Sequence, residues 1–209
     1  MPELKTGFRR VLSIPLVYNC FQSILGADRA RGEYVAKYVR PIHGDRVLDI
    51  GCGTGEILSY LPESIEYHGY DRSQQYIDAA IANHGERGYW HCVSVSEIED
   101  LNYGSFDIVM ANGVLHHLDD TEVRKAVEKA WAVLKPEGRF CSIDGCITDD
   151  QGPISRFIVS QDRGRNIRTP KSYAALISPF FKSVEVVVRH DMLRIPYTHA
   201  ILVGKKAER

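Results

Sequence analysis

A glycine-rich turn directly after an apolar run is the first feature of this sequence that could do chemistry. The run at residues 47–50 leads into the motif GCGTG at residues 51–55, and Asp71 follows 20 residues after Gly51. Glycine adopts backbone conformations that a side chain forbids, and it lets a ligand approach the backbone closely. An acidic side chain at this spacing, after the next strand, accepts hydrogen bonds from both ribose hydroxyls. Turn and acid together indicate a nucleoside ligand.

The spacing of the glycines separates the possible ligands. A dinucleotide fingerprint has its third glycine five residues after the first, whereas Gly51, Gly53 and Gly55 are two apart. No Gly-Lys-Ser or Gly-Lys-Thr follows, which excludes a phosphate-binding P-loop. A nicotinamide oxidoreductase therefore remains only an alternative. Such an enzyme would have a sheet of the predicted kind, but its glycines would be spaced differently.

The elements that must position these residues alternate between short apolar runs and helical periodicity. This alternation predicts an α/β fold with a doubly wound, mostly parallel, Rossmann-like sheet and helices on both faces. The expected strands are residues 46–50, 66–70, 89–93, 106–111 and 138–143. The expected helices are residues 55–61, 74–83 and 121–134.

The helix over residues 121–134 has the clearest pattern. Thr121 is its expected N-cap, and Pro136 follows its end. Its apolar face is expected to consist of Val123, Val127, Ala130, Trp131 and Leu134.

The last part of the chain ends the sheet differently. A helix is expected at residues 171–177, followed by two strands at residues 184–189 and 197–203. Two consecutive strands predict an antiparallel hairpin that closes one edge of a seven-stranded sheet.

Composition limits the class of protein. The chain has 209 residues, enough for one domain, and its 26 basic and 27 acidic residues nearly cancel, which argues against nucleic acid as a partner. The five cysteines form neither CxxC pairs nor a secreted framework, so we expect reduced thiols, a cytoplasmic protein and no metal site.

Residues 1–44 are expected to form a helical lead-in that covers the site. Basic residues before an apolar stretch imitate a secretory signal, but polar residues interrupt that stretch, which is shorter than the roughly 20 residues of a membrane span. An amphipathic helix over the fold is the favoured interpretation, with contact to a membrane surface as the alternative. Tyr18 in this segment is a candidate for substrate binding.

Four motifs in order resemble those of the class I S-adenosylmethionine-dependent methyltransferases. They are residues 47–55, Tyr70-Asp71, residues 106–109 with residues 112–118, and the sequence LKPEG at residues 134–138. The resemblance covers residues 45–145, and the terminal hairpin fits by pattern. It is closest to small single-domain bacterial members.

The resemblance implies S-adenosylmethionine as cofactor and a core at residues 45–147. Asp49 and the glycines would surround the methionine part, Asp71 would hold the ribose, and Arg72 would lie beside the adenine. Family members often carry an acid after the third strand, where this chain has Ser94-Val95-Ser96, so serine hydroxyls or backbone groups would replace it. The expected cofactor-binding residues are Asp49, Gly51, Cys52, Gly53, Gly55, Asp71, Arg72, Ser94, Val95, Ser96, Asn112 and Gly113.

The chemistry of such an enzyme is an in-line substitution, in which positioning contributes about 7 to 11 kcal/mol. A base is needed only when the nucleophile must lose a proton. His116 and His117, after the fourth strand, and Asp144, after the fifth, are the catalytic candidates. Each also has a structural interpretation: the histidines as loop caps, and Asp144 as a turn residue.

Substrate selection is expected to come from residues 148–170, interpreted as a lid ahead of a C-terminal unit at residues 171–209. Arg156, Arg163 and Arg168 in this segment could clamp a carboxylate or phosphate. The alternative is a solvated loop whose charges pair with nearby aspartates.

The sequence thus predicts transfer of a methyl group to O, N or C of a small-molecule or lipid-linked acceptor. A non-catalytic sensor or partner platform that binds S-adenosylmethionine is the alternative. Nucleic-acid methylation is disfavoured because no Asn-Pro-Pro-Tyr type of motif follows the fourth strand. The acceptor and the oligomeric state are not encoded in any motif.

Overall fold

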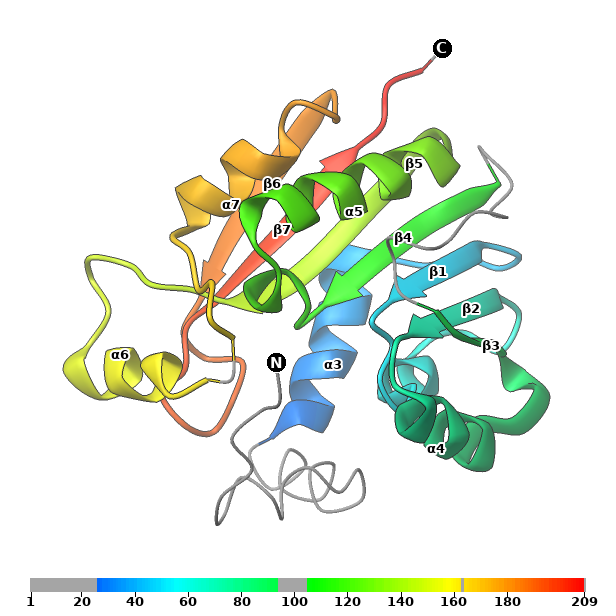
Figure 1. Ribbon diagram of the computed structural model, residues 1–209, viewed down its shortest axis with the longest axis horizontal. Coiled ribbons are helices and arrows are strands. Elements are labelled where there is room, and N and C mark those ends of the chain that lie inside the picture. The colour runs from blue at the N-terminus through cyan, green and yellow to red at the C-terminus, as the bar shows by residue number, and fades with distance from the viewer. Residues whose placement is uncertain (1–25, 94–104, 163, 209) are drawn as a thin grey trace.

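The computed structural model describes residues 26–93, 105–162 and 164–208, which are built around one mixed sheet (Figure 1). The sheet has seven strands in the order β3-β2-β1-β4-β5-β7-β6. The first five strands are parallel to their neighbours, and β7 is antiparallel to both β5 and β6. The strands are β1 (Arg46–Ile50), β2 (Glu66–Asp71), β3 (Tyr89–Cys92), β4 (Phe106–Asn112), β5 (Leu134–Gly145), β6 (Ser183–Arg189) and β7 (His199–Lys205). The predicted Rossmann-like α/β class is confirmed.

The two terminal strands form the expected antiparallel pair, but they do not simply extend one edge. β7 lies between β5 and β6, with Ser142 opposite Leu202 on one side and Val186 opposite Leu202 on the other. The last strand of the chain is therefore an inner strand, and its buried run of Ala200, Ile201 and Leu202 matches that position.

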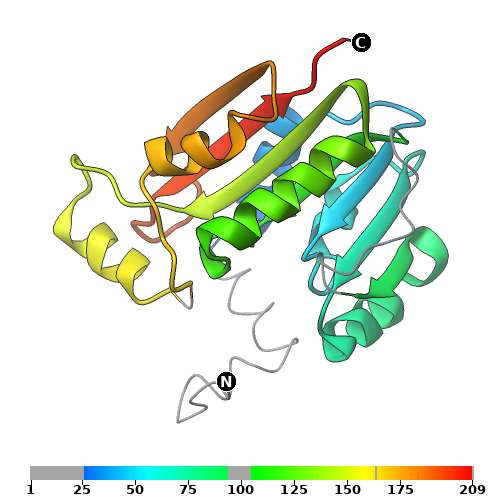
Figure 2. The same cartoon turned by 45° about the horizontal axis from the view of Figure 1, so that its top comes forward.

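Helices cover both faces of the sheet (Figures 1 and 2). On one face, α5 (Asp120–Val133) and α7 (Pro170–Ile177) bury apolar residues such as Val127 and Ile177 against Phe140 and Leu202. On the other face lie α3 (Ala27–Tyr34) and the π-helical turn η1 (Val35–Val39), which pack against residues of β1, β4 and β7. Residues 27–39 are thus helical, while residues 1–25 of the predicted lead-in lie outside the described residues.

Two short elements shape the ends of the strands. The turn after β1 continues into a 3-10 helix, η2 (Glu56–Tyr60), rather than the predicted α-helix at residues 55–61. A second 3-10 turn, η5 (Leu115–His117), follows β4. α4 (Gln74–His84) packs along β2 and β3, and the 3-10 turn η3 (Gly85–Arg87) follows it.

The start and end of α5 differ from the prediction. Asp119, not Thr121, is the N-cap: its side chain accepts from the Glu122 backbone N–H at 2.9 Å, and Glu122 accepts from Asp119 N–H at 2.9 Å. Trp131 is 39% exposed and lies under the Lys206 ammonium at 4.3 Å, so it is not on the buried face. Leu134 is buried, but as the first residue of β5.

Residues 148–170 contain a helix that the sequence analysis treated as charged loop. α6 (Pro153–Ser160) begins with proline in its first turn, a favoured position, and stands beyond the ends of the strands (Figure 1). Its Ile154 and Phe157 side chains are 68% and 65% exposed. Among the described helices, none is long and apolar enough to cross a membrane.

Candidate active site

The glycine turn between β1 and η2 is held by backbone hydrogen bonds. The N–H groups of Gly51 and Cys52 donate to the Tyr70 carbonyl at 2.7 and 3.0 Å, which joins the turn to the end of β2. Gly51, Gly53 and Gly55 have φ values of 70°, 56° and 75°. This left-handed region is accessible to glycine without strain, so the turn requires glycine at each position.

The three glycines differ in what surrounds them. A Cβ at Gly51 would lie 2.5 Å from the Val114 side chain, and one at Gly55 would lie 2.5 Å from Trp90. A Cβ at Gly53 would meet nothing within 4 Å. Gly51 and Gly55 are therefore fixed by packing, while Gly53 presents bare backbone to open space where a ligand can approach.

Asp71 connects the end of β2 to this turn. Its carboxylate accepts from the Gly53 N–H at 3.1 Å and from the Ser73 N–H at 2.8 Å. Each carboxylate oxygen can accept a further hydrogen bond, so both remain able to bind ribose hydroxyls. Arg72 beside it is exposed. Cys52 is buried, which raises the pKa of its thiol and leaves it a protonated packing group.

Buried polar atoms without hydrogen-bond partners lie at the ends of β1 and β4. Asp49 Oδ2 accepts from the Tyr67 hydroxyl at 2.7 Å, but Asp49 Oδ1 has no partner. Neither amide atom of Asn112 has one, nor has the Tyr34 hydroxyl on α3. Buried polar groups are nearly always satisfied, so these atoms indicate a ligand with both donors and acceptors.

Burial also perturbs the charge of Asp49. Loss of hydration raises the pKa of this carboxyl to about 7, against the opposing hydrogen bond from Tyr67. A cationic group placed at Asp49 Oδ1 would stabilise the carboxylate. An ammonium group has the charge and the N–H donors that this position lacks.

His116 and Asp144 do meet, as their places after β4 and at the end of β5 predicted. Asp144 Oδ1 accepts from the His116 backbone N–H at 3.2 Å and pairs with Nδ1 of its ring at 2.8 Å. The other ring nitrogen, Nε2, lies 3.4 Å from Asp162 Oδ1, just after α6. Both side chains are buried, with 8% of His116 and 0% of Asp144 exposed.

These contacts change the role assigned to His116. Burial alone would lower its pKa, but the hydrogen bonds to Asp144 and Asp162 outweigh burial and raise the pKa to about 9. The ring is therefore protonated at neutral pH, with both nitrogens occupied. The candidate base of the sequence analysis cannot accept a proton in this structure.

His117 has the opposite properties. It is exposed, and its ring centroid lies 4.2 Å from that of His116. Partial loss of hydration, and then the positive charge of His116, lower its pKa. His117 is the neutral imidazole of the pair and the one that a substrate can reach.

Arg168 was expected at an acceptor clamp, but its guanidinium is used within the protein. It donates to the carbonyls of Leu115, Leu118 and Asn166 at 2.8 to 2.9 Å, and it pairs with Asp120 at 2.7 Å. With only 9% of its side chain exposed, it fastens residues 164–168 to the loop between β4 and α5.

The other residues predicted to bind substrate or adenine have fewer described contacts. Arg156 is exposed on α6, and Gly113 donates to the Ile143 carbonyl at 2.8 Å. Tyr18, Ser94, Val95, Ser96 and Arg163 lie outside the described residues. Asp162, Tyr197 and Tyr34 were not predicted at the site, because no local motif marks them.

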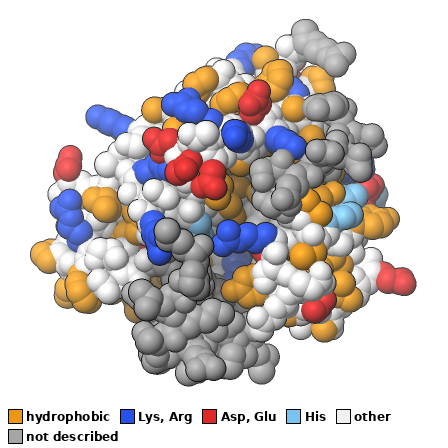
Figure 3. Space-filling view, viewed as in Figure 1, with side chains coloured by type: hydrophobic (Ala, Val, Ile, Leu, Met, Phe, Trp, Pro, Cys, Tyr) orange, Lys and Arg blue, Asp and Glu red, His pale blue; other side chains and the backbone are white. Residues whose placement is uncertain are grey.

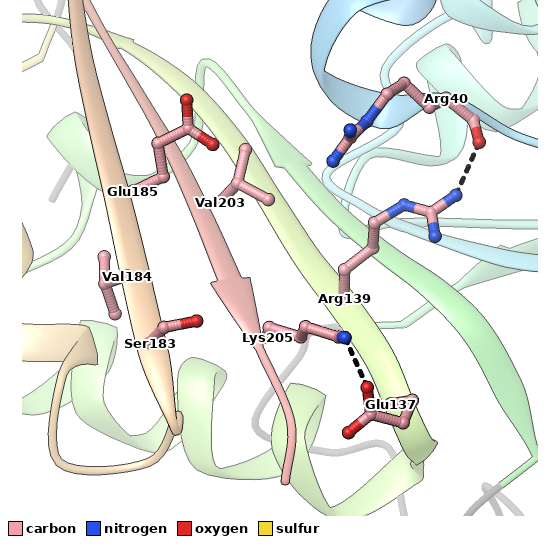
Figure 4. A pocket seen from close by; sticks show the side chains of 8 residues that line it. All are labelled: Arg40, Glu137, Arg139, Ser183, Val184, Glu185, Val203 and Lys205. Carbon is pink, nitrogen blue, oxygen red and sulfur yellow. Dashed lines mark hydrogen bonds and ion pairs between the residues drawn. The ribbon is translucent and has the colours of Figure 1, made fainter.

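A separate cavity of about 640 Å³ opens at the opposite edge of the sheet, beside the start of β5 (Figure 4). Its cations are already paired: Lys205 with Glu137, and Arg139 with the Arg40 carbonyl at 2.6 Å. It is lined by none of the residues of the glycine turn, and its one lining atom that is buried without a partner among the described residues is Glu137 Oε1. On the face seen in Figure 3, basic and acidic side chains are interspersed, which offers no extended basic surface for nucleic acid.

The glycine turn, Asp71 and the unpaired atoms of Asp49 and Asn112 define a nucleoside-binding site in a Rossmann-like α/β protein. Comparison with known proteins narrows this class. Residues 48–140 match the family model of a methyltransferase domain. The uncharacterized methyltransferase YcgJ of Bacillus subtilis (strain 168) is 35% identical over 109 residues, which are 50% of this chain and 42% of that protein.

A ubiquinone biosynthesis O-methyltransferase of Idiomarina loihiensis is 30% identical over 125 residues, 57% of this chain and 50% of that protein. The chain thus spans half or less of the length of these two relatives. Phosphoethanolamine N-methyltransferase 2 of Haemonchus contortus, solved with S-adenosyl-L-methionine, has the same fold, with a TM-score of 0.73 at 17% identity over 100% of this chain and 62% of that one. The family match covers residues 48–140, less than half of this chain; in that part the chain resembles a methyltransferase domain, and the solved structure shows that the fold is shared.

Proposed function

We propose that this protein transfers a methyl group from S-adenosylmethionine to O, N or C of a small-molecule or lipid-linked acceptor. The observation that carries the proposal is the set of unpaired polar atoms of Asp49 and Asn112 beside a glycine turn and Asp71. An amino-acid ammonium suits the unpaired atoms of Asp49 and Asn112, and a ribose suits Asp71 beside the glycine turn. S-adenosylmethionine contains both groups in one molecule.

When bound, S-adenosylmethionine supplies an electrophilic methyl group on a sulfonium, which a lone pair of the acceptor attacks in line. The residues of the chain provide the positioning. Asp71 holds the ribose hydroxyls, Gly53 admits the ligand to the backbone, and Asp49 with Asn112 binds the amino-acid end. Arg72, exposed beside Asp71, lies along the nucleoside.

His117 is the residue we propose to orient the acceptor or take its proton. It is exposed and uncharged near neutral pH, as a general base must be. His116 and Asp144 act through it rather than on the acceptor, because their polar atoms are buried and engaged with each other. For an acceptor without an ionisable proton, His117 contributes orientation only.

The acceptor class is supported by the surroundings of α6. Its exposed Ile154 lines a cavity of about 480 Å³ together with Pro153 and Pro196, and Phe157 is exposed on the same helix. Apolar surface of this kind suits an acceptor with a hydrocarbon part. One relative is named for ubiquinone biosynthesis, which is consistent with a lipid-linked acceptor. The proposal includes a lid function for residues 148–170. It also includes the division of the chain predicted from the sequence and a cytoplasmic location of the protein.

Two measurements test the proposal. Isothermal titration calorimetry with S-adenosylmethionine and with NADH should show binding of the first and not the second. Incubation with libraries of phenols, amines and isoprenoid phenols should then release S-adenosylhomocysteine, and His117→Gln should lower that release without weakening cofactor binding. Binding of NADH alone would overturn the assignment.

A non-catalytic S-adenosylmethionine-binding protein is the second candidate, favoured by the burial of the paired His116 and Asp144 side chains. Tight cofactor binding without product release across the same libraries would support it over the enzyme.

A further inference from the structure

Four side chains from separate parts of the chain meet beside the proposed acceptor site. His116 belongs to η5, Asp144 to the end of β5, Asp162 to the residues after α6, and Tyr197 to the approach to β7. We call these four residues the His116 cluster. It is more extensive than a loop cap requires.

Each side chain of the cluster contacts another, although Asp144 Oδ2 is buried without a hydrogen-bond partner. The two nitrogens of the His116 ring face Asp144 Oδ1 at 2.8 Å and Asp162 Oδ1 at 3.4 Å. The Tyr197 hydroxyl donates to Asp162 Oδ2. The backbone adds one more connection, because the Asn166 N–H donates to the His116 carbonyl at 3.0 Å.

The chain after α6 lies directly on the imidazole. A Cβ at Gly164 would lie 2.0 Å from His116 Cδ2 and 2.8 Å from the His116 carbonyl oxygen. No side chain fits there unless the ring or the segment moves. Gly164 also donates its N–H to Asp162 Oδ1 at 3.3 Å, so it closes the same group of contacts.

The cluster holds two carboxylates against one imidazolium in a buried place. Removing the cation would leave two neighbouring carboxylates unpaired, which is costly. The titratable groups that face His116 come from every neighbouring element: His117, Asp144, Asp162, Tyr197 and His199. His199 and Tyr197 are buried and uncharged at neutral pH, because burial lowers the pKa of His199 to about 4 and raises that of Tyr197. The fixed charges that act on the ring are therefore negative.

We propose that Asp162 and Tyr197 are positioning residues of the acceptor site: through His116 they fix the chain after α6 against the sheet and beside His117. Nothing in the sequence motifs assigns them this role. Asp162 holds the proton on the His116 Nε2 side, and Tyr197 orients Asp162. The His117 ring lies tilted at 4.2 Å from that of His116; the charges of His116 and Arg72 disfavour its protonation, whereas those of Asp144 and Asp162 favour it. The inference rests on the proposed function only where His117 acts on an acceptor.

Nuclear magnetic resonance titration of the histidine rings tests the charge state in the ligand-free protein. In the wild type, His116 should titrate near 9 and His117 below 6.5. In Asp162→Asn, His116 should lose about one unit or more of its pKa, and the pKa of His117 should shift downward, because His116 stays protonated while the negative charge of Asp162 is lost. The matched control is Asp150→Asn, a change at an exposed aspartate before α6, which should move neither resonance.

Tyr197→Phe keeps all charges and removes one hydrogen bond, so it tests the cluster even if Asp162→Asn does not fold. It should shift His116 in the same direction by a smaller amount. A wild-type His116 that titrates near 6.5, or one that is unmoved in both variants, would overturn the inference.

Cofactor binding separates this inference from the proposed function. Asp162→Asn should bind S-adenosylmethionine within about twofold of the wild type, since the contacts of Asp162 are with His116, Gly164 and Tyr197 and not with the glycine turn. If the wild type binds none, the proposed function fails while the titration still decides the cluster. With an acceptor that is turned over, Asp162→Asn should raise the acceptor KM and move the pH profile of kcat to lower pH; a uniform fall in kcat with an unchanged profile would indicate a merely structural role.

Discussion

The two halves of the site at the carboxyl edge of the sheet differ in how complete they are without a ligand. At the ends of β1 and β4, Asp49 and Asn112 keep unpaired polar atoms, and Gly53 faces open space. In η5, which follows β4, His116 pairs with carboxylates on both sides. The first half needs a ligand to supply the missing partners, whereas in the second half the protein supplies most partners itself, with Asp144 Oδ2 as an exception. Residue types alone predicted both halves as parts of the site but not this difference between them.

The largest expected effect is the pH dependence of protein stability that arises from Asp49, in the half of the site with unpaired polar atoms. Asp49 titrates at about 7 in the folded protein and near 3.8 when unfolded, so its contribution to stability is complete below 3.8 and is lost as the pH rises through 7. At roughly 1.4 kcal/mol per pKa unit, the loss is on the order of 4 kcal/mol. Asp49→Asn should remove it, making the variant more stable than the wild type at pH 8 but not at pH 4.

Urea unfolding at both pH values measures this difference, with Asp78→Asn on the exposed side of α4 as the control. The His116 cluster should lose stability in a higher window, between 6.5 and about 9, because His116 is also a group with a raised pKa. A stability curve that is flat from pH 4 to 9 would contradict both assignments.

Next in size is the effect of Arg168→Ala on the half of the site that contains His116. Its guanidinium donates to three carbonyls and pairs with Asp120, and their loss should destabilise the protein by about 3 kcal/mol. Thermal unfolding measures this loss. Arg156→Ala, on the exposed surface of α6, should have little effect. If Arg168 were instead an acceptor clamp, its replacement would weaken acceptor binding and leave stability unchanged.

Asp71→Ala should weaken cofactor binding at the half of the site that contains Asp49 and Asn112. A hydrogen bond to a charged group is worth about 1.5 to 3 kcal/mol, so S-adenosylmethionine affinity should fall by roughly 10- to 150-fold in calorimetry. Asp78→Ala again serves as the matched control. Unchanged affinity would remove Asp71 from the site and with it the nucleoside interpretation.

The smallest expected effect concerns α5, which supports the sheet and belongs to neither half of the site. Asp119→Ala removes the capping box of α5 and should cost about 1 kcal/mol of stability. It should leave cofactor affinity and the titration of His116 unaltered, because α5 only supports the sheet from behind. A change in either quantity would show that the helix start influences the site.

The sequence predicted what depends on local pattern. Strands β1, β2 and β4 were found within a residue or two because buried apolar runs are read directly, and the glycine turn was found because its φ values require glycine. Leu134 was misassigned because a helical apolar face was extended past the point where β5 begins. Trp131 does lie in α5, but it is partly exposed beneath Lys206, which helical periodicity does not reveal.

The parts that were missed depend on contacts distant in the chain. His116 and Asp162 are 46 residues apart, and Tyr197 is 35 residues beyond Asp162. No spacing rule predicts that such residues meet, so His116 was interpreted as a base. α6 was missed although Pro153 and the apolar residues after it were a usable signal.

The place of β7 has a consequence for how the chain folds during synthesis. β6 is made before β7, yet among the described strands it pairs only with β7. Until residues 199–205 have left the ribosome, β6 has no neighbour in the sheet and β5 has an unsatisfied edge. The nascent chain must therefore hold an exposed apolar edge until its final strand inserts, which makes this interval the one in which a chaperone would matter most.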